Sequence, residues 1–184
     1  GPLGRRRLGG NRFAQPDRRH HGRAGGGGSR ARLSVPPLPE RFRDPASAAR
    51  IALIAESHER LLGRPLVAGG GDAAGALWRS PLAIVAHGTE ADPRFFFASH
   101  AALNAFAATL DQFIGMPSRL SAEAPLREER QALLDRVSAE GFIDDYAGIR
   151  VRLDGTRFRI ERATVWNLIG ADAIRHGQAA AFAV

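Results

Sequence analysis

The chain has 184 residues, enough for one domain of roughly 140 residues with a substantial hydrophobic core, plus a tail. It contains no Cys, and all 26 basic residues are Arg. Disulfides, Cys-based zinc sites, thiolate nucleophiles, flavin–cysteine photoadducts and Lys Schiff bases are therefore excluded. The net charge of +7 is confined to the N-terminus, because residues 1–33 carry +8 and residues 34–184 carry −1.

Residues 1–44 are expected to lie outside the domain. The first four, GPLG, resemble the scar left when an expression tag is removed. The rest of 1–33 is rich in Arg and Gly and too poor in apolar residues to repay its ordering entropy, which predicts disorder. Its arginines would bind nucleic acid only weakly, through phosphate contacts. Residues 36–39 (PPLP) predict a stiff connector.

The domain is expected over residues 45–184 and begins with a helix. Asp44 is a favourable N-cap, and Pro45 suits the first helical position, while Gly63 follows the predicted end, so residues 45–62 are expected to be helical. A shorter helix is expected over residues 73–78. The chain has no long apolar run, so we expect no membrane contact and take the cytoplasm as the default location.

Residues 77–99 (LWRSPLAIVAHGTEADPRFFFAS) predict the opening of a sheet. An apolar strand over 81–86 precedes a polar elbow, and an aromatic strand over 94–98 follows it. A helix of small residues is expected over 101–108, and a loop then leads to the connector 115–123.

The second half of the chain predicts one helix and three strands. Pro125 begins a helix that runs to about Ala139. The strands are expected over residues 142–153, 156–169 and 174–184, and the Asp154-Gly155 dipeptide is a strong hairpin signal between the first two. Two strands, several helices and three more strands predict an α+β fold with a five-stranded antiparallel sheet.

Four motifs follow one another along the chain, and they are residues 86–89 (AHGT), 92–93 (DP), 117–123 (PSRLSAE) and 164–167 (TVWN). Their order resembles the MEKHLA domain, a family similar to PAS sensor domains that is found in small bacterial proteins and at the end of plant class III homeodomain leucine-zipper regulators. The resemblance covers about residues 45–184 and includes residues 57–63 (SHERLLG). Ala86 departs from the Ser common in the family, and Ser99-His100 departs from Asn-Arg.

The resemblance implies the strand order 2-1-5-4-3, with helices over one face and an N-terminal accessory helix. The accessory helix, residues 45–62, has an apolar stripe that would cover its own sheet or that of a second copy. We therefore expect a homodimer.

A ligand site is expected between the sheet and the connector 115–123, because the Ala-rich last strand leaves space over the centre of the sheet. The residues expected to line it are Phe97, Arg119, Trp166, Asn167 and Gln178. Alternation along a strand places Trp166 and Asn167 on opposite faces, so one lines the site while the other packs in the core or at a dimer contact. Asn167 and Gln178, on neighbouring strands, would contact the ligand or each other.

Arg119 has two possible roles. It would bind a carboxylate or phosphate of the ligand, or it would lock the connector through Glu123 or a backbone carbonyl. Thr89 and Asp92 are expected to cap backbone amides at the elbow.

His87 and His58 are the histidines that could take part in function. His87 would ligate haem iron or hold a polar ligand group, or it is a turn histidine whose ring nitrogen bonds a nearby backbone group. His58 lies on the apolar face of a helix, as a core histidine or as a ligand. No histidine pair has metal-ligand spacing with carboxylates, so no metal site is expected.

Three functions are compatible with these residues. The preferred one is a non-catalytic sensory or interaction domain that binds a small ligand, a protein partner or a second copy of itself, since no nucleophile, base and acid occur together. The alternative is a sensor for haem or another cofactor, with His87 or His58 as the iron ligand. A small enzyme in the cleft between sheet and helices has the least support.

Overall fold

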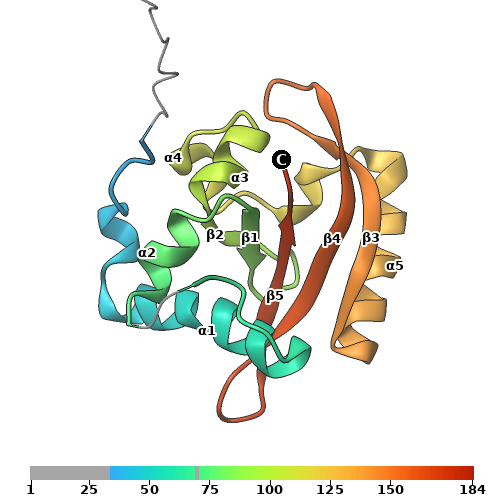
Figure 1. The fold of residues 1–184 in the computed structure, drawn as a ribbon. Helices are drawn as coiled ribbons and strands as arrows, with labels where there is room; N and C mark the ends of the chain where they lie inside the picture. Colours follow the sequence, from blue (N-terminus) through green and yellow to red (C-terminus); the bar gives the residue numbers. More distant parts are fainter. Residues whose placement is uncertain (1–33, 69–70) are drawn as a thin grey trace, which may run out of the picture. The chain divides into compact units, whose positions relative to one another are not determined.

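The computed structural model describes residues 34–68 and 71–184, so the predictions for the Arg-rich tail lie outside the described residues. Its centre is an antiparallel sheet in the order β2-β1-β5-β4-β3 (Figure 1). The strands are β1 (Ala83–His87), β2 (Phe95–Ala98), β3 (Phe142–Val151), β4 (Arg157–Ile169) and β5 (Arg175–Phe182). The predicted fold class and strand order are confirmed.

The helices largely follow the prediction. They are α1 (Pro45–Leu62), α2 (Ala73–Trp78), α3 (His100–Ala105), α4 (Leu110–Phe113) and α5 (Ala124–Glu140), with 3-10 turns η1 (Glu40–Phe42) and η2 (Ser118–Ser121). The short α4 replaces an expected loop, because Thr109 and Gln112 form a capping box. No helix in the described part of the chain is both long and apolar enough to cross a bilayer.

Packing begins before the expected boundary at Pro45. Phe42 is buried, with its ring 5.2 Å from that of Phe97. The indole N–H of Trp78 donates to the Pro36 carbonyl at 2.7 Å, which fastens the connector to α2. The proline-rich connector is therefore part of the folded unit.

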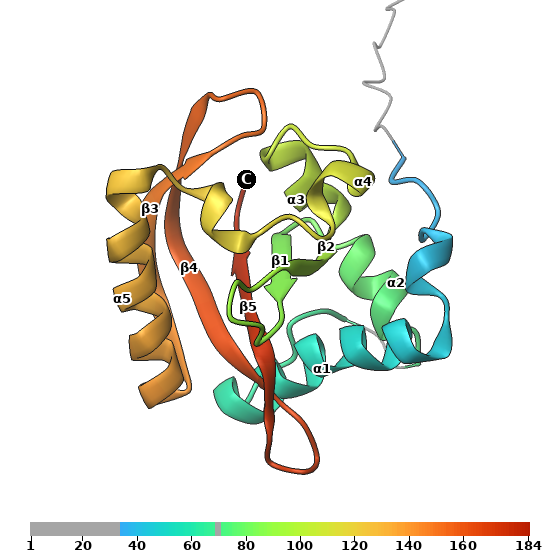
Figure 2. The ribbon, with the colours of Figure 1, turned by 180° about the vertical axis from the view of Figure 1, so that it is seen from behind.

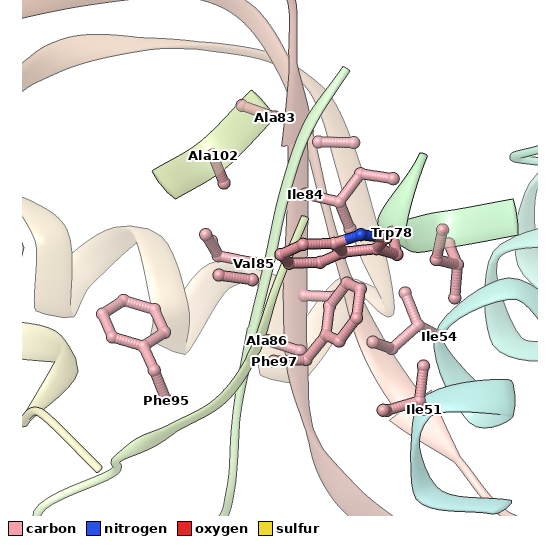
Figure 3. Close-up of a cluster of buried hydrophobic side chains, with 14 of the residues drawn as sticks. Ile51, Ile54, Trp78, Ala83, Ile84, Val85, Ala86, Phe95, Phe97 and Ala102 are labelled. Carbon is pink, nitrogen blue, oxygen red and sulfur yellow. The ribbon is translucent and has the colours of Figure 1, made fainter. Parts of the chain in front are cut away.

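Helices cover both faces of the sheet. Figure 3 shows Ile84, Trp78 and Ile54 on one side of β1, and Phe95 and Ala102 on the other side. We call the side that packs on α1 and α2 the α1 face. We call the opposite side, which packs on α3, α4 and α5, the α5 face. In both ribbon views α5 lies along β3, away from α1 (Figures 1 and 2).

Polar contacts of Ser57, Arg60 and Trp166 fasten α1 to β4. The Ser57 hydroxyl donates to the Ile169 carbonyl at 3.2 Å and accepts from the Ile169 N–H at 2.9 Å. The indole N–H of Trp166 donates to the Ile54 carbonyl at 3.1 Å. α1 thus covers its own sheet, so the homodimer stays a prediction that would need a different surface.

The β3–β4 hairpin forms as expected at Asp154-Gly155. Gly155 has φ 84°, which favours a residue without Cβ, and Asp154 accepts from the Thr156 N–H at 2.9 Å. Arg162, with φ 52°, marks an irregularity where the pairing of β3 and β4 shifts.

Candidate ligand pocket between the sheet and α5

Phe97 and Trp166 do not lie with the other residues predicted to line a site. Both are fully buried on the α1 face, where Phe97 packs on Phe42 and the Trp166 ring packs edge-on against His58 at 5.0 Å. Asn167 and Gln178 lie on the α5 face, as strand alternation requires. The sheet therefore separates Phe97 and Trp166 from Asn167 and Gln178, and these four side chains do not line one space.

Asn167 and Gln178 contact each other, which was one of the two expected outcomes. The Gln178 side-chain amide donates to the Asn167 side-chain oxygen at 3.0 Å. Asn167 in turn donates to the Val137 carbonyl at 3.0 Å, and Gln178 to the Leu134 carbonyl at 3.1 Å. Both strands are thereby tied to the C-terminal half of α5.

Arg119 locks the connector to the elbow. Its guanidinium donates to both carboxylate oxygens of Asp92, at 3.1 and 3.3 Å. Glu123, the expected partner, instead accepts from Arg157 at 2.8 Å. Asp92 therefore acts through Arg119 and not as the predicted cap of backbone amides, while Thr89 lies exposed at the elbow.

His87 and His58 are buried on opposite faces of the sheet. Nδ1 of His87 lies 2.8 Å from the Gly88 carbonyl, so it carries the proton and donates. Burial is the main cause that lowers the pKa of His87 to about 4. Nδ1 of His58 lies 3.0 Å from the Arg64 carbonyl, and burial also lowers the pKa of His58. Each ring thus already bonds a backbone group.

A cavity of about 50 Å³ lies between the α5 face and α5. Most of its wall is apolar, and its lining residues are Val85, His87, Phe95, Phe106, Ser121, Arg130, Leu133, Leu134, Tyr146, Arg150, Ile160, Ala163, Val165, Gln178, Ala179, Ala180 and Phe182. A polar groove of about 300 Å³ continues from it along the elbow. His87, Arg130, Leu134 and Gln178 line both spaces.

The connector contributes residues to both spaces. η2 of the connector contributes Ser121 to the cavity, and Arg119 lines the outer groove. Of the residues predicted from the sequence, Gln178 and His87 line both spaces. The free space lies over Ala180, on the α5 face, because Ala180 pairs with Val85 and Val165. Ala181 pairs with Ile84 and therefore points into the α1 core.

Sequence reasoning missed two buried arginines in the cavity, Arg130 on α5 and Arg150 on β3, each 8% exposed. The spacing of these two arginines from buried neighbours could have predicted that they face inward. Arg130 lies three residues before Leu133 and seven before Val137, on the buried stripe of α5. Arg150 follows Tyr146 and Gly148 at strand spacing, on the inward face of β3.

Two side chains of the cavity that could act as a nucleophile or a base, Ser121 and His87, already bond backbone groups. Ser121 donates its hydroxyl proton to the Ser118 carbonyl at 2.7 Å, and His87 is held by Gly88. Within residues 34–68 and 71–184, no cluster of three His, Asp or Glu side chains could hold a metal ion. Small-molecule sites usually have about 300–1,000 Å³, so the cavity alone is too small for a porphyrin.

Three solved structures share this fold. The PAS domain of a protein from Colwellia psychrerythraea has a TM-score of 0.52 at 17% identity, over 59% of this chain and 90% of that chain. A variant of Vivid has a TM-score of 0.51 at 14% identity, over 71% of this chain and 99% of that chain. An RNA-binding light-oxygen-voltage receptor has a TM-score of 0.50 at 14% identity, over 58% of this chain and 30% of that chain.

At these identities the solved structures establish the fold alone, which is PAS-like. Comparison with curated protein sequences gives no significant match. The sequence of residues 48–184 matches the MEKHLA domain, and this match covers most of the chain. The order of motifs, the strand order and the sequence match agree, and the chain belongs to the MEKHLA domain family.

Proposed function

We propose that this protein is a non-catalytic sensory domain that binds a small ligand in the cavity between the α5 face and α5. One observation carries this proposal: a mostly apolar cavity into which a few polar side chains converge, the usual composition of a small-molecule site. Membership of a PAS-like family supports it, because PAS-like domains are sensory modules.

The same cavity suggests how binding would be transmitted. Its wall is made partly by α5, through Arg130, Leu133 and Leu134, and partly by the sheet, through Val165 and Ala180. A ligand that contacts both would favour one position of α5 over others, which is the differential contact that any switch requires. α5 is held to the sheet mainly by the four-residue cluster Leu133, Val137, Ile143 and Val165 and by the Asn167–Gln178 pair.

The experiment is a thermal-shift and NMR screen of the purified protein against a fragment panel that includes xenon, small carboxylic acids and their neutral amides. Ala180→Leu should fill the cavity and abolish every response. The matched control, Ala139→Leu on the exposed side of α5, should keep them. If no probe, xenon included, binds the unmodified protein, the cavity is part of a closed core and the ligand-binding proposal fails.

Haem remains the alternative ligand for a sensory role. It would require α5 to move away from the sheet and His87 or His58 to release its backbone partner. A Soret band in protein produced with added haem, absent in the His87→Asn or His58→Asn variant, would favour this alternative.

A further inference from the structure

Two arginines point into the cavity without an acidic partner. Among the described residues, the Arg130 side chain has no hydrogen bond and no ion pair. Arg150 donates to the neighbouring Ile149 carbonyl at 3.0 Å, and its guanidinium lies 5.0 Å from the Tyr146 ring centroid. Both side chains are more than nine-tenths buried.

This arrangement is costly in an empty protein. A buried charge normally has a partner of opposite sign, because desolvation is otherwise uncompensated. Elsewhere in the chain arginines have such partners, such as Glu123 for Arg157 and Asp145 for Arg136. No acidic residue lines the cavity in the part of the chain that the structure describes.

The two guanidinium groups also act on each other. Burial first, and then the charge of Arg150, lower the pKa of Arg130 to about 10. Arg130 nevertheless stays protonated at neutral pH, so the cavity holds two positive charges that nothing in its described wall neutralises. An anion that binds in the cavity would offset both the burial of the two charges and the repulsion between them.

The shape and lining indicate which anion fits. A guanidinium fork matches a carboxylate in a planar, two-bond arrangement. The apolar walls, among them Phe95, Ile160 and Phe182, have no hydrogen bonds to offer, so the rest of the guest must be apolar. A dry cavity of about 150 Å³ holds benzene, so the inner 50 Å³ holds only about two or three non-hydrogen atoms, the size of a carboxylate group, and the rest of a larger guest extends into the groove.

Tyr146 completes the polar corner. A Cβ on Gly148 would lie 2.2 Å from the Tyr146 hydroxyl oxygen, so only glycine allows this hydroxyl to lie across β3 beside Arg150. Tyr146, Gly148 and Arg150 share one face of the strand. The hydroxyl can donate to a carboxylate that the two arginines hold.

We propose that the cavity is a receptor site for a small organic acid, whose carboxylate lies between Arg130 and Arg150 and whose apolar part packs on the sheet around Ala180. This proposal rests on the proposed function and names its ligand class. The anion contacts Arg130 of α5 and Arg150 of β3, so its binding draws α5 towards β3.

The test uses the full chain and titrates acetate, butyrate and benzoate by calorimetry and by NMR, with butyramide and benzamide as neutral counterparts and inorganic phosphate as a second anion. At least one carboxylate should bind and its amide should not. Arg130→Met and Arg150→Met should each weaken carboxylate binding by ~10- to 100-fold, the range of a lost charge-assisted hydrogen bond. Arg136→Met, on the exposed side of α5, should leave it unchanged.

The melting temperature of the ligand-free variants separates a binding role from a structural one. An arginine without a partner costs stability, so Arg130→Met should melt at the same temperature as the original protein or higher. If Arg130 is needed for folding, the Arg130→Met variant should have a lower melting temperature than the original protein. Arg130→Lys, which keeps the charge but loses the fork, should retain only part of the carboxylate binding.

Several results would overturn the assignment. If amides bind as tightly as acids, and Arg130→Met changes neither, the site takes neutral ligands and only the ligand class is wrong. If phosphate binds more tightly than every carboxylate, the site takes an inorganic anion and the ligand has no apolar part. If no probe binds, or if binding survives Ala180→Leu, the ligand site itself is refuted along with its class.

Discussion

Gln178 and Asn167 form one buried hydrogen-bonded pair across β5 and β4, with 3.0 Å between the Gln178 amide nitrogen and the Asn167 amide oxygen. Each residue also donates to a carbonyl of α5. The pair lies beside the cavity and connects the sheet on one side of it to α5 on the other side. It therefore couples α5 to two strands of the sheet, to which the helix would otherwise be joined mainly by a few apolar side chains.

This pair predicts a non-additive pattern of stability. Asn167→Ala and Gln178→Ala should each lower the free energy of unfolding by about 1–3 kcal/mol, since each leaves buried polar groups without partners. The double variant should cost less than the sum of the two, with a coupling of roughly 0.5–2 kcal/mol. Urea unfolding of the original protein, the two single variants and the double variant measures this coupling. Simple additivity would show that the two side chains act independently.

His87 predicts a loss of stability in mild acid. Its pKa is lowered from 6.5 to about 4 by burial, so the unfolded chain takes up a proton between these pH values while the folded protein does not. Neutral His87 therefore leaves the free energy of unfolding unaffected above pH 6.5. As the pH falls from 6.5 towards 4, His87 lowers the free energy of unfolding by about 3 kcal/mol. Burial of His58 acts in the same direction.

Urea unfolding of the original protein and of His87→Asn, at several pH values between 7.5 and 4.5, checks this. Asn can donate to the Gly88 carbonyl from nearly the position of Nδ1 but does not titrate. The variant should show a clearly smaller decline in acid. An equal decline would mean that other groups cause it.

Ala180 and Ala181 predict opposite outcomes for the same substitution. Ala180→Leu enters the cavity on the α5 face and should keep or raise the melting temperature. Ala181→Leu enters the packed α1 face, where Ala181 is 6% exposed, and should cost roughly 1–3 kcal/mol by overpacking. Equal destabilisation by the two would show that the α5 face is as tightly packed as the α1 face.

Ser57 predicts how strongly α1 is held to the sheet. Ser57→Ala removes one hydroxyl that bonds both the N–H and the carbonyl of Ile169, and should lower the free energy of unfolding by about 1–3 kcal/mol. Glu56→Ala, on the exposed side of the same helix, is the control and should change it by less than about 0.5 kcal/mol. A Ser57→Ala protein as stable as the control would show that water replaces the hydroxyl.

Local signals were sufficient for the five strands and for every α-helix except α4. Asp44 and Gly63 bound α1 as cap residues do, and Asp154-Gly155 forms the hairpin, because these preferences act over a few residues of backbone. Alternation along β4 also separated Trp166 from Asn167 correctly, since successive side chains of a strand point to opposite faces. Family motifs then supplied the strand order.

Only the tertiary structure decided which face is open and which charges are left without partners. Composition shows that the last strand is rich in small residues, but whether Ala180 or Ala181 meets empty space depends on how closely α1 and α5 approach the sheet. Arg119 was expected to bind a ligand anion or a group of its own connector, yet it donates to Asp92 of the elbow. Arg130 and Arg150 are twenty residues apart in sequence, and packing of α5 on β3 alone brings them into one cavity, because burial and charge pairing are set by contacts between distant segments.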